Sequence, residues 1–292
     1  MSTRLPKASP MDICFITDNP ETKNHPVIGR VIQLLSLNHT MRVLDVASLT
    51  GDEAFAQERE RRLADIYLLK SHALQALEVA AHLEQAEALV VNSSPSSLAC
   101  RDRVLMAQRM EKAHLPCPHT WSFSSIEELQ EKEGCLATLA FPLIIKSRHS
   151  YRGDLVGTVS TLGDLQALLA RRKREPLILQ EFAQGDGWDV KLWIIGQQVF
   201  AARRRSTLEA GARKDDFPIP AQQLPAAWRS IALQVGRVFD LLLYGLDLVI
   251  TEKGPVIVDV NSFPGFRGVP GADSALVSLI EGLVSCRGTS MS

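Results

Sequence analysis

GLDLVITEKGPVIVDVN, residues 245–261, contains two runs of aliphatic residues separated by Glu252, Lys253 and Gly254. This pattern predicts two antiparallel strands that are joined by a tight hairpin turn. If Lys253 lies at the centre of the turn, Asp247 pairs directly with Asp259. The hairpin therefore brings two carboxylates together on neighbouring strands.

Side chains alternate between the two faces of such a hairpin. One predicted face is entirely aliphatic and indicates a core, and it consists of Leu246, Leu248, Ile250, Val256, Val258 and Val260. The other face carries the two acids and is formed by Gly245, Asp247, Val249, Ile257, Asp259 and Asn261. Like charges on opposed residues, about 5 Å apart, destabilise a sheet unless they are neutralised. Because Mg²⁺ prefers carboxylate and amide oxygens, we predict that Asp247, Asp259 and Asn261 bind a metal. The alternative is a half-exposed hairpin whose acids face water.

The chain before this hairpin alternates short apolar strands with helical segments from residue 11 to residue 94. This alternation predicts an α/β layer with a largely parallel sheet. Ligands of parallel sheets bind beyond the carboxyl ends of the strands. Candidates for the substrate side are therefore Asp18, Asn19, Lys70, Ser71, His72, Asn92 and Ser93.

The remaining pattern predicts mixed α+β units. We expect one amphipathic helix at 99–113, a second helix at 124–133, and a strand at 141–147 that leads into the basic loop RHSYRGD. Strands then dominate from residue 176 onward, with a helix at 228–242. The predicted domains are 11–98, 99–178 and 179–285.

Composition narrows the class of protein. With 292 residues, 46% of them hydrophobic, the chain is long enough for more than one core. A net charge of −1 gives no general attraction to nucleic acid or to a membrane surface. The five cysteines are scattered, and neither a signal peptide nor a membrane span is indicated. We therefore expect a cytoplasmic protein with neither nucleic-acid nor membrane partners.

The segment LDLVITEKGPVIVDVNSFPGFRGV, 246–269, resembles the C-terminal signature of the ATP-grasp superfamily, RimK type, a glutathione synthetase-like group. FPLIIK, QEF and GWDVKLWIIG precede it in the order that the family requires. The resemblance covers about residues 90–275. It implies an ATP-grasp fold, α/β and α+β, in which an N-terminal Rossmann-like (pre-ATP-grasp) domain precedes two α+β lobes that enclose ATP.

The resemblance also implies roles for individual residues. Lys146 would contact phosphate, Glu181 and Phe182 would lie along the adenine, and Asp189 would lie near the ribose. The full set implied for nucleotide binding is Arg103, Lys146, Gln180, Glu181, Phe182, Asp189, Lys191 and Arg204. The catalytic candidates are Arg148, His149 and Arg267.

Three features of the sequence bear on these roles. The RHSYRGD loop has a single glycine, Gly153, where the family is often glycine-rich. Arg103 stands where a lysine is common, and Arg213 and Lys214 lie in a stretch that departs from the family pattern. A turn at 196–197 would also place Asp189 opposite Arg204, which allows a purely structural ion pair instead.

By this resemblance the protein is an ATP-dependent, ADP-forming ligase that joins a carboxylate and an amine through an acylphosphate. ATP and Mg²⁺ are the implied cofactors, with Mn²⁺ as a substitute, and the substrates are small-molecule or peptide carboxylates and amines. The alternative is a small-molecule kinase, because NSFPGFRGV is also similar to the ending of inositol polyphosphate kinases. A nucleotide-binding regulator without turnover is the third interpretation, and a homo-oligomeric state is left open.

Overall fold

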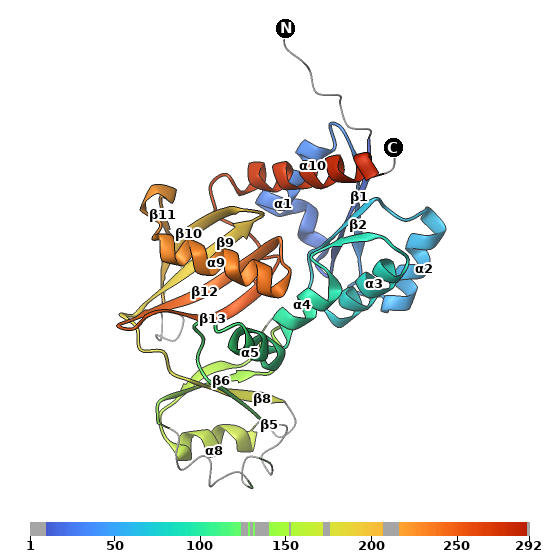
Figure 1. Ribbon diagram of the computed structural model, residues 1–292. Helices are drawn as coiled ribbons and strands as arrows, with labels where there is room; N and C mark the ends of the chain where they lie inside the picture. The colour runs from blue at the N-terminus through green and yellow to red at the C-terminus, as the bar shows by residue number, and fades with distance from the viewer. Residues whose placement is uncertain are drawn as a thin grey trace.

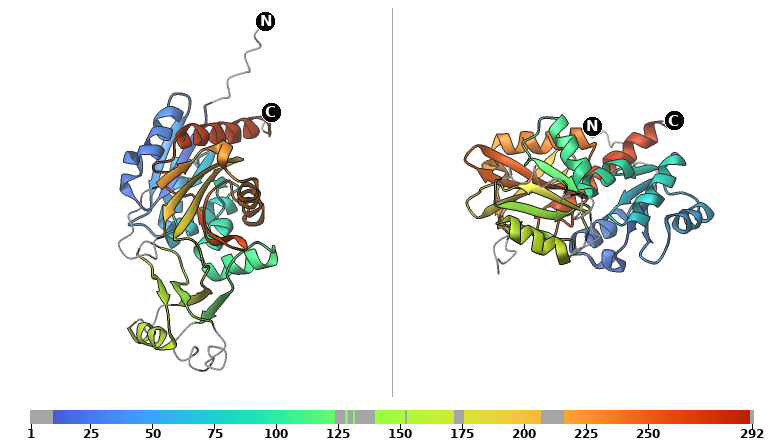
Figure 2. Two further views of the ribbon diagram at one scale, coloured as in Figure 1. Left: turned by 90° about the vertical axis from the view of Figure 1, so that its left-hand side faces the viewer. Right: turned by 90° about the horizontal axis from the view of Figure 1, so that it is seen from below.

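The computed structural model describes residues 10–123, 128, 131, 140–151, 153–171, 176–206 and 216–290. In this part of the chain the strands form three sheets, and their orders are β2-β1-β3-β4, β5-β8-β6-β7 and β11-β10-β9-β12-β13. Figures 1 and 2 place the sheet with β5–β8 at one end of the molecule and the N-terminal sheet at the other.

The N-terminal sheet is parallel throughout, as the alternating pattern predicted. Its strands are β1 (Asp12–Thr17), β2 (Thr40–Asp45), β3 (Ile66–Leu69) and β4 (Leu89–Val91). The accompanying helices are η1 (Pro20–Asn24), α1 (Pro26–Leu35), α2 (Gly51–Arg61) and α3 (Leu74–Gln85). Sequence reasoning missed α2, although Thr50 and Glu53 form a capping box at its start.

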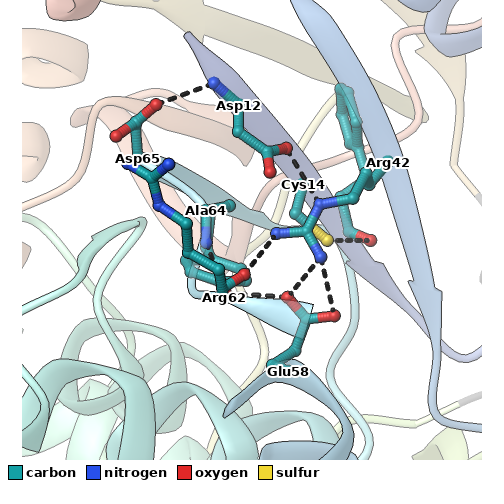
Figure 3. Close-up of polar contacts among 9 residues, drawn as sticks. Asp12, Cys14, Arg42, Glu58, Arg62, Ala64 and Asp65 are labelled. Atoms are coloured by element: carbon teal, nitrogen blue, oxygen red, sulfur yellow. Dashed lines mark hydrogen bonds and ion pairs between the residues drawn. The ribbon is translucent and has the colours of Figure 1, made fainter. Parts of the chain in front are cut away.

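A buried polar network ties α2 to this sheet (Figure 3). Glu58 is 1% exposed and forms an ion pair of 3.0 Å with Arg42 Nη1. Arg42 Nε also donates to Asp12 Oδ1 at 2.9 Å, and the Tyr67 hydroxyl donates to Glu58 Oε2 at 2.8 Å. Because burial desolvates Glu58, these partners are what stabilise its charge inside the protein.

The helix expected at 99–113 is in fact two helices, α4 (Ser94–Arg101) and α5 (Arg103–Lys112). The break falls at Asp102, whose Oδ1 accepts hydrogen bonds from the Val104 and Leu105 amides. Asp102 also forms an isolated antiparallel bridge with His149. The helix is therefore interrupted by a backbone contact with a residue far away in the sequence. The amphipathic pattern of the sequence gives no sign of such a contact.

The central sheet is antiparallel and consists of β5 (Thr120–Phe123), β6 (Leu143–Ser147), β7 (Val156–Val159) and β8 (Leu177–Glu181). Helix α8 (Leu162–Arg171) packs its apolar side chains into the core of this sheet. The helix predicted at 124–133 lies almost entirely outside the described residues.

The five-stranded sheet contains the predicted hairpins. It is formed by β9 (Trp188–Ile195), β10 (Gln198–Arg205), β11 (Asp216–Ile219), β12 (Leu243–Thr251) and β13 (Gly254–Ser262). Its helical neighbours are η2 (Ala221–Gln223), α9 (Ala226–Phe239) and the terminal α10 (Ala272–Ser290). The division of the chain at 98 and 178 stays a proposal. Side chains of α4 and α5, from the second range, share a core with the sheet of the third.

The hairpin face prediction was partly wrong. The turn pairs Thr251 with Gly254, and an irregularity beside Asp247 shifts the register, so that Asp247 still opposes Asp259. As a result Ile257 is fully buried in the core, whereas Val258 lines the same pocket as the two acids. One extra residue on β13 changes the face of the sheet to which the neighbouring side chains point, as β-bulges do.

The N-terminal and five-stranded sheets share one hydrophobic cluster. Phe15 of β1, Trp193 of β9 and Phe263 belong to it, together with apolar side chains of α1 and α10. Figure 1 shows α10 beside α1, running across the top of the view from above the five-stranded sheet toward β1. In the described residues, no helix combines the length and the apolarity that crossing a bilayer requires.

Candidate active site

One pocket between the central and five-stranded sheets contains all eight residues predicted to bind the nucleotide. These residues are Arg103, Lys146, Gln180, Glu181, Phe182, Asp189, Lys191 and Arg204. Two of the three predicted metal ligands, Asp247 and Asp259, line the same pocket. Sequence segments that are distant along the chain therefore converge on one concave site, where ligands usually bind.

The oxygens of the predicted metal ligands have an unusual environment. Asp259 Oδ1 is buried and has no hydrogen-bond partner within the described residues, and Asn261 Oδ1 is buried on the same hairpin face, beside His72. Buried polar atoms are nearly always paired, so the orphaned carboxylate oxygen requires an explanation. A hard cation supplies one, because carboxylate and amide oxygens are its preferred ligands. The donor set therefore fits Mg²⁺.

Cationic side chains lie next to both Asp247 and Asp259. Lys191 Nζ lies 2.8 Å from Asp247 Oδ1, and Arg103 Nε lies 3.9 Å from Asp259 Oδ1. Arg103 Nη1 additionally donates to the Ser147 carbonyl at 2.8 Å and to Asp154 Oδ2 at 2.7 Å. The predicted like-charge pair thus lies between cations. Sequence reasoning missed Asp154, which fixes Arg103 from the end of the RHSYRGD loop.

Lys146 lies near the end of strand β6 and points across the pocket. Its Nζ donates to the Val258 carbonyl at 2.9 Å, next to Asp259. Burial lowers the pKa of Lys146 to about 8, a change that Asp259 opposes and that Arg103 reinforces. A buried cation held beside two carboxylates is well placed for a phosphate group.

Replacing Lys146 with Met tests its predicted contact with phosphate. A charge-assisted hydrogen bond contributes roughly 1.5–3 kcal/mol, so we expect the Kd for magnesium-ATP to rise by about 10- to 100-fold. Isothermal titration calorimetry measures this change, and Lys112→Met, at an exposed position on α5, is the control. Equal ATP affinity in the Lys146 variant and the parent would rule out the contact.

The QEF segment forms the end of β8 and the wall of the pocket. Gln180 is 5% exposed and donates from Nε2 to Thr120 Oγ1 at 3.0 Å. The Glu181 amide donates to the His119 carbonyl at 3.1 Å, and Glu181 Oε2 accepts from the His119 amide. Phe182, which follows, is half-buried against the pocket. The strand end thus offers an apolar ring and backbone groups side by side.

The predicted turn at 196–197 is present and pairs Asp189 with Arg204 across β9 and β10. Arg204, however, forms its ion pair with Asp216 of β11, with Nε 2.6 Å from Oδ1 and Nη2 2.9 Å from Oδ2. The side chain of Arg204 thus lines the pocket while Asp216 fixes its guanidinium. Register alone could not distinguish these partners, because β11 joins the sheet from a later segment.

The three catalytic candidates lie outside this pocket lining. Arg148 Nη2 pairs with Asp102 Oδ2 at 2.7 Å, and His149 Nε2 lies 3.6 Å from the same oxygen. Burial opposes ionisation of Asp102, but the hydrogen bonds from Arg148 and two backbone amides hold its pKa below the usual value. Arg148 and His149 therefore anchor the RHSYRGD loop to the start of α5. Arg267 is exposed in the loop after β13.

The fold is shared with solved structures of ATP-grasp proteins. The crystal structure of a RimK domain ATP-grasp protein from Sphaerobacter thermophilus superposes with a TM-score of 0.71 at 20% identity, covering 94% of this chain and 99% of that one. D-alanine–D-alanine ligase from Bacillus anthracis complexed with ATP gives a TM-score of 0.72 at 16% identity, covering 97% of this chain and 100% of that one. The fold class of this chain is therefore the ATP-grasp fold.

Sequence comparison defines the family within this class. The model for the RimK-like ATP-grasp domain matches residues 100–276, so the chain belongs to that family. A probable alpha-L-glutamate ligase of Chromohalobacter salexigens is 27% identical over 197 residues, or 65% of this chain and 64% of the relative. A protein of the same description in Shewanella halifaxensis is 23% identical over 197 residues, or 65% of this chain and 43% of the relative. The chain thus spans less than two thirds of these relatives.

Proposed function

We propose that this protein is an ATP- and magnesium-dependent ligase that joins a carboxylate to an amine. The observation that carries the proposal is the pocket in which the predicted nucleotide residues lie beside Asp247 and Asp259. The names of its relatives, alpha-L-glutamate ligase and D-alanine–D-alanine ligase, favour amino acids or peptides as substrates. We also propose a cytoplasmic location for this chemistry.

The proposed reaction has two steps. A carboxylate oxygen attacks the γ-phosphorus of ATP, ADP leaves, and an acylphosphate forms. The amine nitrogen then attacks the acyl carbon, phosphate leaves, and the nitrogen loses a proton. Bound Mg²⁺ would neutralise phosphate charge during the transfer. In this chain Asp247, Asp259 and Asn261 would hold the metal, while Lys146 and Arg103 would bind phosphate oxygens.

The nucleotide end of the pocket is proposed to lie at the end of β8. There Phe182 would cover one face of the adenine, and the backbone at 180–182 would pair with its edge. Asp189 would lie near the ribose, with Lys191 and Arg204 beyond it toward the acids. Positioning and charge neutralisation are sufficient for phosphoryl transfer, so the site needs no further general base for the first step.

A kinase that acts on a polyanion is less well supported by the contacts of the basic run 203–205. Arg203 pairs with Asp186 at 2.7 Å, Arg204 pairs with Asp216, and Arg205 lies 4.2 Å from the centroid of the Trp188 ring. These partners already neutralise or cover the three arginines. The arginines are therefore poor candidates to line one shared pocket for a polyphosphate.

A product survey tests the proposed function. The purified protein is incubated with magnesium-ATP and with pools of amino acids, short peptides and inositol phosphates, and products are identified by mass spectrometry. We expect ADP, phosphate and a product whose mass equals acid plus amine minus water. A phosphorylated polyol would support the kinase instead, and ATP binding without any product would support the regulator.

A further inference from the structure

The side chain of Gln180 is a buried polar group at the pocket end that is proposed for the adenine. Its cross-strand neighbours are Thr120 on β5 and Ile144 on β6. Gln180 lines the pocket, whereas Leu179, the residue before it, packs in the core on the other side of the sheet. Because Gln180 is only 5% exposed, its amide needs hydrogen-bond partners inside the protein or from a ligand.

A chain of hydrogen bonds fixes the orientation of this amide. The Thr120 hydroxyl donates to the Pro118 carbonyl at 3.2 Å and accepts from Gln180 Nε2 at 3.0 Å. A hydroxyl has one proton, and Thr120 commits it to Pro118 because a carbonyl can only accept. Gln180 must therefore present its NH2 group to Thr120 and turn its oxygen away. Within the part of the chain that the structure describes, Gln180 Oε1 has no hydrogen-bond partner.

The other polar side chain of the QEF segment is held elsewhere. Glu181 is exposed, and its Oε2 accepts from the His119 amide at 3.3 Å. The Glu181 carboxylate therefore lies along the segment that leads into β5. Gln180 Oε1 is accordingly the buried side-chain acceptor that the end of β8 offers to a ligand.

An acceptor that is held in one orientation distinguishes the purine bases. Adenine carries a 6-amino group, which donates hydrogen bonds, whereas guanine and hypoxanthine carry a 6-oxo group, which accepts them. Gln180 Oε1 can accept from the amino group, but with a 6-oxopurine two oxygens would face each other. An unrestrained amide could turn over and donate from Nε2 instead. Thr120 opposes this change, because the turned amide would direct its oxygen at a hydroxyl whose proton is already donated to Pro118.

We propose that Thr120 determines base specificity and makes the nucleotide site select adenine over 6-oxopurines. The proposal rests on the proposed function, which places the adenine at the end of β8. Among the described residues that line the pocket are Gln180 and Pro118 but not Thr120, so Thr120 acts through Gln180 as a positioning residue. Thr120 also lies outside the FPLIIK, QEF and GWDVKLWIIG segments, and motif order therefore gave no sign of this role.

Isothermal titration calorimetry with magnesium-ATP and magnesium-ITP, without acid or amine substrates, tests the proposal. Inosine triphosphate presents the 6-oxo group and lacks the 2-amino group of guanine. We expect the parent to bind ATP about 100-fold more tightly than ITP, because an unpaired buried acceptor weakens binding by about that factor. Thr120→Val removes the hydroxyl and keeps nearly the same shape. In this variant the preference for ATP should fall about tenfold, mainly through tighter binding of ITP.

The controls separate specificity from folding. Thr120→Ser keeps the hydroxyl and should keep the preference of the parent. Thr40→Val, at an exposed position of β2, is the matched control for a strand threonine. Thr120→Ala removes the same hydroxyl and provides the same test if Thr120→Val does not fold, as judged by circular dichroism.

Each outcome decides a different claim. An unchanged ratio of the two Kd values in Thr120→Val, with both nucleotides bound equally well or equally weakened, would overturn the role of Thr120 and leave the ligase intact. Equal affinity of the parent for ATP and ITP would do the same. If the parent binds neither nucleotide, the proposed function fails and the base specificity fails with it.

Discussion

Asp259→Asn should lower the rate of product formation by roughly 100- to 1000-fold, because a metal-held charge stabilises the transition state by several kcal/mol. The substitution removes charge but almost no volume. It leaves a neutral amide of the same shape beside Arg103 and Lys146, so folding should persist. We expect the melting temperature to change by only about 2 °C. Steady-state kinetics with the substrate pair from the product survey measures the loss.

The control for this prediction is Asp164→Asn, which removes an exposed carboxylate from the first turn of α8. Raising the magnesium concentration should recover part of the activity of the Asp259 variant if the aspartate binds the metal. Parent-like turnover of that variant at saturating magnesium would refute the assignment of Asp259 as a ligand. Loss of its folded state, seen by circular dichroism, would instead indicate a structural role.

Glu58→Ala should destabilise the protein by about 2–4 kcal/mol, because Arg42 loses one of its two carboxylate partners and the Tyr67 hydroxyl loses its acceptor. Glu58 is 1% exposed, pairs with Arg42 and accepts from the Tyr67 hydroxyl. The alanine removes the carboxylate from both contacts and leaves a void. Urea unfolding measures the difference in the free energy of unfolding. Glu58 does not line the pocket, so the Kd for magnesium-ATP should not change while the variant is folded.

Glu60→Ala is the matched control, since Glu60 lies on the same helix and is exposed. Its free energy of unfolding should stay within about 0.5 kcal/mol of the parent. Tyr67→Phe removes only the hydroxyl from the network and should therefore have an intermediate effect. Equal stability of the Glu58 and Glu60 variants would show that the buried network does not stabilise the fold.

The hairpin could be found without any family resemblance, because local pattern suffices for such a feature. Alternating aliphatic residues predicted β12 and β13, and the pairing of Asp247 with Asp259 was confirmed. The pairing arises in a different way from the one expected. The hairpin turn is one residue shorter than predicted, and the register shift beside Asp247 restores the predicted pairing of the two acids. A bulge depends on packing against neighbouring strands, so Ile257 and Val258 could not be assigned to faces from the sequence.

Local pattern was enough to predict the parallel N-terminal sheet and the hairpins of the five-stranded sheet, which follow from periodicity and turn chemistry. The eight pocket-lining residues that we assign to nucleotide binding were named from the family resemblance, through the order of its motifs along the chain. Three other features became visible only in the folded chain: Asp102 divides α4 from α5, Arg204 pairs with Asp216, and Arg42 pairs with the buried Glu58. Each of these contacts joins residues of different elements, and side-chain charge acts through space whatever the distance along the chain.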